Sequence, residues 1–377
     1  FGYCSFGAGL WIQAEYCSTG WTSEIRGMVQ RFLSVRGAVM KKKRNEALNV
    51  LEGVACICVV MLHCSFPGDV GRILYGVSRF AVPLFFAVSG YFVYSEEWAK
   101  VRRTLPDKGK HIAVLFLGTE ILYFIWHILR PFLIHGNFMG AAEWLAAEFT
   151  TKNILDFIIF QKTLIGDVSW FLVALLMCYL VTFPIAKYNI WKKCTLLIIP
   201  LLCINVLLGE LGALTKVKIQ WYWCSNFWLL GFPCYALGFW LRIYEEKIRK
   251  LLTPGRSFAV ILATGVASVA ERAATGENQL YFSNIPFMLC CFVFCLNCPE
   301  LPAKSRILKI FGRLGEKYSF GIYILHPIAR DVLKIIADKA GFSDQSMWKW
   351  CLPIMAVMFS FMVWRVWRAV LAAFGRK

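Results

Sequence analysis

Residues 78–92, Ser78-Arg-Phe-Ala-Val-Pro-Leu-Phe-Phe-Ala-Val-Ser-Gly-Tyr-Phe92, carry one charged side chain near their start and are otherwise largely apolar. They belong to the apolar window Ile73–Tyr94, which has the ~20 residues that a helix needs to cross a bilayer. Pro83 removes a backbone N–H donor and predicts a kink in this helix. Ser89 and Gly90 are small and predict the close approach of another helix. The stretch therefore predicts a transmembrane helix.

Similar apolar windows follow one another along the chain, and the composition agrees with them. Hydrophobic residues make up 58% and charged residues 17% of the 377 residues, and mean hydropathy is +0.57. Soluble domains have ~45–50% apolar and ~25% charged residues. We predict an all-α polytopic integral membrane bundle of about ten transmembrane helices. The nine other windows are Leu48–Phe66, Ile112–Ile134, Val168–Ala186, Cys194–Leu208, Phe227–Leu241, Ser257–Ala270, Leu280–Leu296, Ser319–Ile336 and Cys351–Val370.

Basic residues indicate the orientation of these helices. The net charge is +18, and the basic residues sit in short runs between the apolar windows. If ten helices alternate from a cytoplasmic run Lys41–Arg44, most Lys and Arg residues fall in cytoplasmic loops, as the positive-inside rule requires. Both termini are then cytoplasmic, in a multi-pass protein of the cell membrane whose partner is the lipid bilayer. No polar domain carries a basic patch, so we expect no nucleic-acid partner.

The chain divides into two parts at Met40. Residues 1–39 are rich in Gly and Ser and lack a sustained apolar span, and they lack the regions of a cleavable signal. We expect them to be a non-native or disordered extension. Residues 40–377 then form one membrane domain.

Ionisable side chains inside apolar windows mark candidate sites, because they are costly in a bilayer. Glu52 and His63 lie eleven positions apart, so a helix places them ~20° apart around its axis and ~16 Å apart along it. Cys56 and Val59 share this face. His63 is a candidate general base, because the usual pKa of histidine lies near working pH. The alternative is a histidine that hydrogen-bonds a neighbouring helix.

Further polar and aromatic residues are candidates. Arg79 suits a clamp for a phosphate or an oxyanion, although an arginine near a helix end also snorkels to the interface. Glu120 and His326 are further ionisable residues within apolar windows. Trp170 suits either an interfacial aromatic belt or sugar stacking. Cys295 and Cys298 form a lone C-x-x-C, so we expect no metal site.

Five segments in order give the chain a resemblance to the acyltransferase family 3 membrane proteins, which acylate cell-surface sugars, over about residues 45–370. The first segment ends in a histidine, and the last contains a His-Pro pair. The segments are Leu51–His63, Arg79–Phe92, Trp170-Phe-Leu-Val-Ala-Leu175, Asn226-Phe-Trp-Leu-Leu-Gly-Phe-Pro233 with Leu237-Gly238, and Tyr318-Ser-Phe-Gly-Ile-Tyr-Ile-Leu-His326-Pro327.

The resemblance implies an O-acetyltransferase-like enzyme. Its donor substrate is acyl-CoA, most simply acetyl-CoA, from the cytoplasm, and its acceptor is a hydroxyl of a bacterial extracytoplasmic glycan such as a cell-wall polysaccharide. His63 removes the hydroxyl proton, directly or through an acyl relay, and Arg79 stabilises the oxyanion or orients the donor. Arg102 and Arg103 bind the phosphates of the donor. Glu52, Glu120, Trp170, Asn226 and His326 are substrate or secondary polar residues.

A transporter is the alternative function. Glu52, His63 and Arg79 would then line the path of a small polar solute or an acyl group, without catalysis. Transporters often show internal repeats, and the sequence has no convincing halves.

Overall fold

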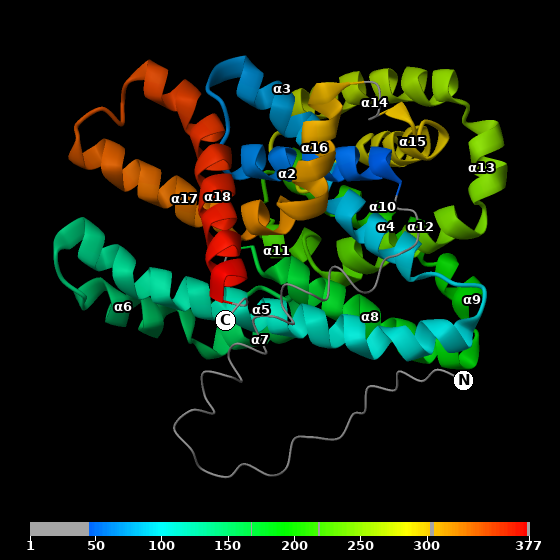
Figure 1. The fold of residues 1–377 in the computed structure, drawn as a ribbon, viewed down its shortest axis with the longest axis horizontal. Coiled ribbons are helices and arrows are strands. Elements are labelled where there is room, and N and C mark those ends of the chain that lie inside the picture. Colours follow the sequence, from blue (N-terminus) through cyan, green and yellow to red (C-terminus); the bar gives the residue numbers. More distant parts are fainter. Residues whose placement is uncertain (1–44, 167, 218, 302–304, 375–377) are drawn as a thin grey trace, which may run out of the picture. The chain divides into compact units, whose positions relative to one another are not determined.

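The computed structural model describes residues 45–166, 168–217, 219–301 and 305–374, and every regular element in these ranges is a helix (Figure 1). The predicted extension 1–39 and the basic run Lys41–Arg44 lie outside the described residues. The helices are α2 (Glu46–His63), α3 (Gly68–Ser78), α4 (Ala81–Val93), α5 (Trp98–His135), α6 (Met139–Glu148), α7 (Thr151–Phe160), α8 (Trp170–Tyr188), α9 (Trp191–Thr195), α10 (Ile198–Thr215), α11 (Trp221–Cys224), the π-helical turn η1 (Phe227–Gly231), α12 (Phe232–Ile243), α13 (Glu245–Leu251), α14 (Pro254–Thr275), α15 (Asn284–Asn297), α16 (Arg306–Lys317), α17 (Ser319–Lys339) and α18 (Ser346–Phe374).

The described residues up to Val366 form one compact unit, and the end of α18 from Trp367 is assigned to a second. All features discussed below lie in the first unit.

The all-helical class is confirmed, and each predicted window coincides with a helix or a helix pair. By length and composition, seven helical segments in the described ranges can cross a membrane. The segments Phe227–Ile243 and Asn284–Asn297 are apolar but shorter. Helix α17 is long enough, but Arg330, Asp331 and Lys334 make its second half polar. The number of spans and the side of the termini stay predictions.

The window Ile73–Tyr94 is two helices, α3 and α4, joined at Arg79 and Phe80. The physical reason is Pro83, which has no N–H to donate to the carbonyl of Arg79 four residues earlier, so the helical ladder is interrupted there. The junction places Arg79 at the carboxyl end of α3. Pro83, for which the sequence predicts a kink, thus positions Arg79, a candidate site residue.

Glycines let the helices of the bundle approach closely, as the Ser89-Gly90 pair predicts. A Cβ atom on Gly90 of α4 would lie 2.0 Å from the carbonyl oxygen of Tyr235 in α12. A Cβ on Gly238 of α12 would lie 2.0 Å from the carbonyl oxygen of Ala87. The two glycines thus make one backbone-to-backbone crossing of α4 and α12, which only side chains of this size permit.

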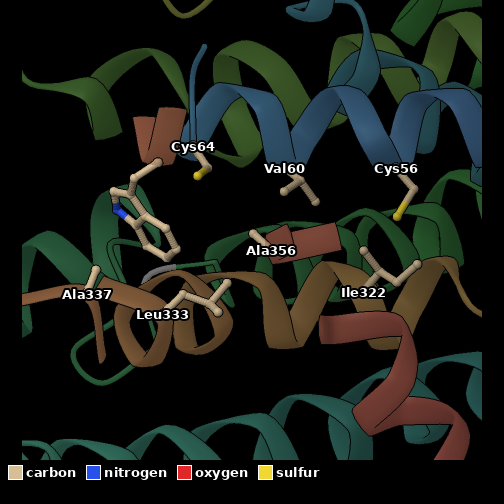
Figure 2. Packing of buried hydrophobic residues seen from close by; sticks show 8 residues of the cluster. Cys56, Val60, Cys64, Ile322, Leu333, Ala337 and Ala356 are labelled. Atoms are coloured by element: carbon tan, nitrogen blue, oxygen red, sulfur yellow. The ribbon is translucent and has the colours of Figure 1, made fainter. Parts of the chain in front are cut away.

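Helices α2, α17 and α18 pack around a common apolar cluster (Figure 2). The Cys56 thiol also donates to the carbonyl of Ser319 at the start of α17, at 3.3 Å. This packing sets α17 against the face of α2 that leads to His63. The cluster comprises Cys56, Val60, Cys64, Ile322, Leu333, Ala337, Trp348 and Ala356.

Candidate active site

His63 is the last residue of α2, and the helix face behind it is buried. Glu52, Cys56 and Val59 are at most 5% exposed, whereas His63 as a whole residue is exposed. The inward-facing stripe predicted from the sequence is therefore confirmed, with the imidazole at its open end. Glu52 lies about three helical turns away along the same face, so the structure does not bring the two ionisable groups together.

His326 of α17 is the nearest aromatic partner of His63. The centroids of the two imidazole rings lie 5.0 Å apart, with the ring planes tilted by 51°. His326 is fully buried. Its Nδ1 lies 2.7 Å from the carbonyl oxygen of Tyr323, whereas its Nε2 has no hydrogen-bond partner among the described residues. Two candidates that are distant in sequence thus form one pair.

Arg330 is a site residue that the sequence reasoning missed. Its Nη1 donates to the backbone carbonyl of His63 at 3.4 Å, and its Nε and Nη2 donate to Asp331 at 3.1 and 2.9 Å. Arg130 of α5 approaches the other oxygen of Asp331 at 3.7 Å. A signal was available, because a residue four positions after His326 lies on the same helix face.

Arg79 lies half-buried at the junction of α3 and α4. Its Nη1 donates to Oε1 of Gln279 at 2.9 Å, its Nη2 donates to the hydroxyl of Tyr75, and its guanidinium lies 4.4 Å from the centre of the Tyr75 ring. Its Nε is buried without a partner among the described residues. The sequence reasoning did not select Tyr75 or Gln279, because neither carries charge and Gln279 lies in the loop between α14 and α15.

Positive charge acts on the imidazole of His63 from two elements. The guanidinium groups of Arg79 and Arg330 both act on it electrostatically. They come from the α3–α4 junction and from α17, so the tertiary fold assembles this environment. Such a pair favours an anion or a developing oxyanion beside the imidazole.

Glu120 reaches the start of α8, where Trp170 lies. Glu120 accepts a hydrogen bond from the hydroxyl of Ser169, which also donates to the carbonyl of Gly166 at 2.7 Å. Trp170 follows directly and is 9% exposed, with its ring 6.4 Å from that of Phe86 and 6.4 Å from that of Trp221. Glu120 therefore holds the turn that places Trp170 against α4 and α11.

Asn226 is buried and bonds only to backbone groups in the contacts observed. Its amide nitrogen donates to the carbonyls of Tyr222 and Trp223 at 2.9 and 2.7 Å, and its oxygen accepts from the N–H of Leu229 at 2.9 Å. It thereby joins α11 to the π-helical turn η1. Its amide stabilises the turn beside which Trp221 lies.

Arg102 and Arg103 lie in the first turns of α5. Arg102 is half-buried and donates to the carbonyl of Ala186, near the end of α8, at 3.0 Å. Arg103 is exposed. Arg102 therefore fixes the helix pair, and Arg103 presents its guanidinium to solvent.

A cavity of about 230 Å³ lies beside Gln279. Since Gln279 also accepts from Arg79, the cavity wall is bonded directly to the arginine of the site. Trp221 contributes an aromatic face, and amide and carboxylate groups contribute polar ones. Its lining residues are Gly209, Gly212, Ala213, Val217, Ile219, Gln220, Trp221, Cys224, Thr275, Glu277, Asn278 and Gln279.

Metal ligands do not gather in the described ranges: no three His, Cys, Asp or Glu side chains there are placed to hold an ion. The chemistry available at the site is that of two imidazoles and two guanidiniums.

Seven apolar helical segments long enough to cross a membrane in the described ranges, with a histidine pair beside Arg330, define a multi-pass membrane protein with a polar site. A family model described as an acyltransferase domain matches residues 45–367. The chain therefore belongs to acyltransferase family 3, as its motifs predict. The comparisons with curated proteins and with solved structures gave no match.

Proposed function

We propose that the protein transfers an acetyl group from cytoplasmic acetyl-CoA to a hydroxyl of an extracytoplasmic glycan, with His63 as general base. The observation that carries this proposal is the position of His63 at the end of α2: the residue is solvent-exposed, its ring lies 5.0 Å from that of His326, and its backbone carbonyl accepts from Arg330 at 3.4 Å. A base must be accessible to its substrate. The oxyanion that forms when a hydroxyl attacks the thioester carbonyl needs positive charge beside it.

The reaction begins with the acceptor hydroxyl hydrogen-bonded to a nitrogen of His63. The imidazole takes the proton as the hydroxyl oxygen attacks the thioester carbonyl and a C–O bond forms. Arg79 stabilises the oxyanion of the tetrahedral intermediate. The C–S bond then breaks, and the CoA thiolate leaves with the proton held by His63, which returns the imidazole to its neutral form.

The donor is assigned to the end of the bundle where α5 begins. Arg103 is exposed there and is available for a phosphate of CoA, and Arg102 beside it has guanidinium N–H groups beyond the one that bonds Ala186. Arginine binds phosphate through two parallel N–H groups. The donor phosphates would be held here while the acyl group reaches His63.

The acceptor is assigned to the cavity beside Gln279. Sugars bind to sites that combine an aromatic face with hydrogen-bonding amides and carboxylates, and Trp221, Asn278 and Glu277 offer these groups. The link from Gln279 to Arg79 supports a single site that holds the acceptor next to the oxyanion position.

The test uses purified protein in liposomes with labelled acetyl-CoA and glycan oligosaccharides. We expect label to move to the oligosaccharide and His63→Ala to lower the rate by about 10²–10⁴-fold, as loss of a general base does. His135→Ala is the matched control, because His135 is an exposed histidine at the end of another helix, α5. Wild-type turnover in His63→Ala would overturn the role of His63.

The same liposomes test the transporter alternative. Uptake of a small polar solute or of free acetate, without any transfer to oligosaccharide, would replace the enzyme by a transporter. Acyl transfer that is lost with His63→Ala supports the enzyme.

A further inference from the structure

The His326-Pro327 pair of α17 leaves one helical carbonyl without its usual donor. In an α-helix, the N–H at position 327 would donate to the carbonyl of Tyr323, but proline has no N–H. Nδ1 of His326 lies 2.7 Å from that oxygen and takes the place of the missing donor. A freed carbonyl inside a membrane protein is commonly satisfied in this way by a nearby side chain.

This bond fixes the tautomer of His326. A carbonyl oxygen only accepts, so Nδ1 must carry the hydrogen. A neutral imidazole has one N–H, and Nε2 is therefore an acceptor with a free lone pair. Nε2 is buried and unpartnered among the described residues. A buried acceptor in this state is poised to receive one hydrogen bond.

His63 is the donor that the geometry offers to Nε2. Tyr323, the next ring, donates its hydroxyl to the carbonyl of Val168, and the contacts of Arg330 are to Asp331 and the His63 carbonyl. The ring centroids of His63 and His326 lie 5.0 Å apart, close enough for a change of the His63 rotamer to direct an N–H at Nε2. Catalytic hydrogen bonds often tighten only when substrate binds.

We propose that His326 is a positioning residue for His63: its Nε2 accepts one N–H of the His63 ring and leaves the other nitrogen of His63 unprotonated and turned toward the acceptor hydroxyl. His326 is fully buried and its Nδ1–H is held by the Tyr323 carbonyl, so the ring serves as a neutral acceptor. One series of contacts sets the tautomer of His63. It runs from Pro327 through the Tyr323 carbonyl to His326 and then to His63. The proposal rests on the proposed function.

Substitution of His326 separates this role from packing. His326→Gln keeps an acceptor oxygen in place of Nε2, whereas His326→Leu fills similar space without one. We expect His326→Gln to retain most of kcat and His326→Leu to lose about 10²-fold in kcat, with KM for acetyl-CoA unchanged in both. Equal activity in the two variants, or a more active leucine variant, would overturn the proposal.

Pro327→Ala tests the origin of the tautomer. Alanine restores an N–H for the Tyr323 carbonyl and favours the helix, so the variant should fold while His326 loses its fixed partner. We expect a lower kcat at unchanged KM for acetyl-CoA. Pro184→Ala in α8 is the control, since it is also an exchange inside a membrane helix, and it should leave kcat as in wild type. A wild-type kcat in Pro327→Ala would contradict the proposed series of contacts from Pro327 to His63.

Nuclear magnetic resonance of protein labelled with ¹⁵N-histidine gives a readout that does not depend on activity. We expect His326 protonated at Nδ1 only, and a change in the His63 tautomer in His326→Leu. A hydrogen on Nε2 of His326, or an unchanged His63 in that variant, would refute the positioning role even if acyl transfer is observed. The predicted tautomers without any acyl transfer would instead refute the proposed function and leave the positioning relationship in place.

Discussion

Arg330 in α17 donates a hydrogen bond to the backbone carbonyl of His63 at the end of α2, at 3.4 Å. The last carbonyls of a helix have no partner within it, so this guanidinium caps α2 at the residue that carries the candidate base. His326 lies one turn earlier on α17 and faces the ring of the same histidine. One helix therefore fixes both the backbone and the ring environment of His63.

Arg330→Ala should lower kcat about tenfold, which corresponds to ~1.4 kcal/mol. The variant uncaps α2 and lets His63 shift, while the protein keeps its fold because Arg130 still faces Asp331. Steady-state acyl transfer measures the effect. Arg256→Ala is the matched control, because Arg256 also donates to a carbonyl at a helix end, that of Leu251 at 3.0 Å, but belongs to α14. Equal losses in both variants would contradict a specific role for Arg330.

Arg79→Lys should lower kcat by about 10²–10³-fold, the loss typical for one oxyanion donor. A lysine is a point charge and cannot bond Gln279 and lie over the Tyr75 ring as a planar guanidinium does. Acyl transfer at saturating acetyl-CoA measures this loss. Arg72→Lys in the same helix is the control, since Arg72 is exposed and pairs only with Asp69, at 3.0 Å, in the contacts observed. A wild-type rate in Arg79→Lys would remove Arg79 from the chemistry.

Gly90→Ala should destabilise the fold by ~1–3 kcal/mol, the usual range for overpacking. The new Cβ would lie 2.0 Å from the Tyr235 carbonyl oxygen and would push α12 away from α4. Gly118→Ala in α5 meets nothing within 4 Å and should be neutral or stabilising. Thermal unfolding in detergent compares the two exchanges. A lower midpoint for Gly118→Ala than for Gly90→Ala would contradict the tight crossing.

Trp221→Ala should raise KM for the oligosaccharide acceptor about tenfold and leave KM for acetyl-CoA unchanged, because Trp221 lines the cavity assigned to the acceptor. Trp223 is the matched control. It lies two residues further on in α11, and the two side chains are 37% and 39% exposed, but Trp223 is not part of the cavity lining. Equal KM changes in the two variants would contradict the assignment of the acceptor to this cavity.

The sequence alone was enough to predict the class of protein and to select His63 and Arg79 as candidates. The excess of apolar windows required helices that bury their backbone hydrogen bonds in a bilayer. The 3.6-residue period placed Glu52, Cys56, Val59 and His63 on one face, and the structure buries the first three of them. An ionisable residue inside an apolar window is costly in a bilayer, so its presence indicates a site. His63 and Arg79 were selected for this reason.

Tertiary structure decided which of these residues meet. The periodicity of one helix says nothing of its neighbours, because helix pairing depends on small residues and side-chain shapes on both partners. The partners of His63 and Arg79, namely His326, Arg330 and Gln279, come from segments far along the chain. Gln279 carried no local signal of a site, since it gains its role only when the helices pack. Arg330 carried only its spacing of four residues from His326.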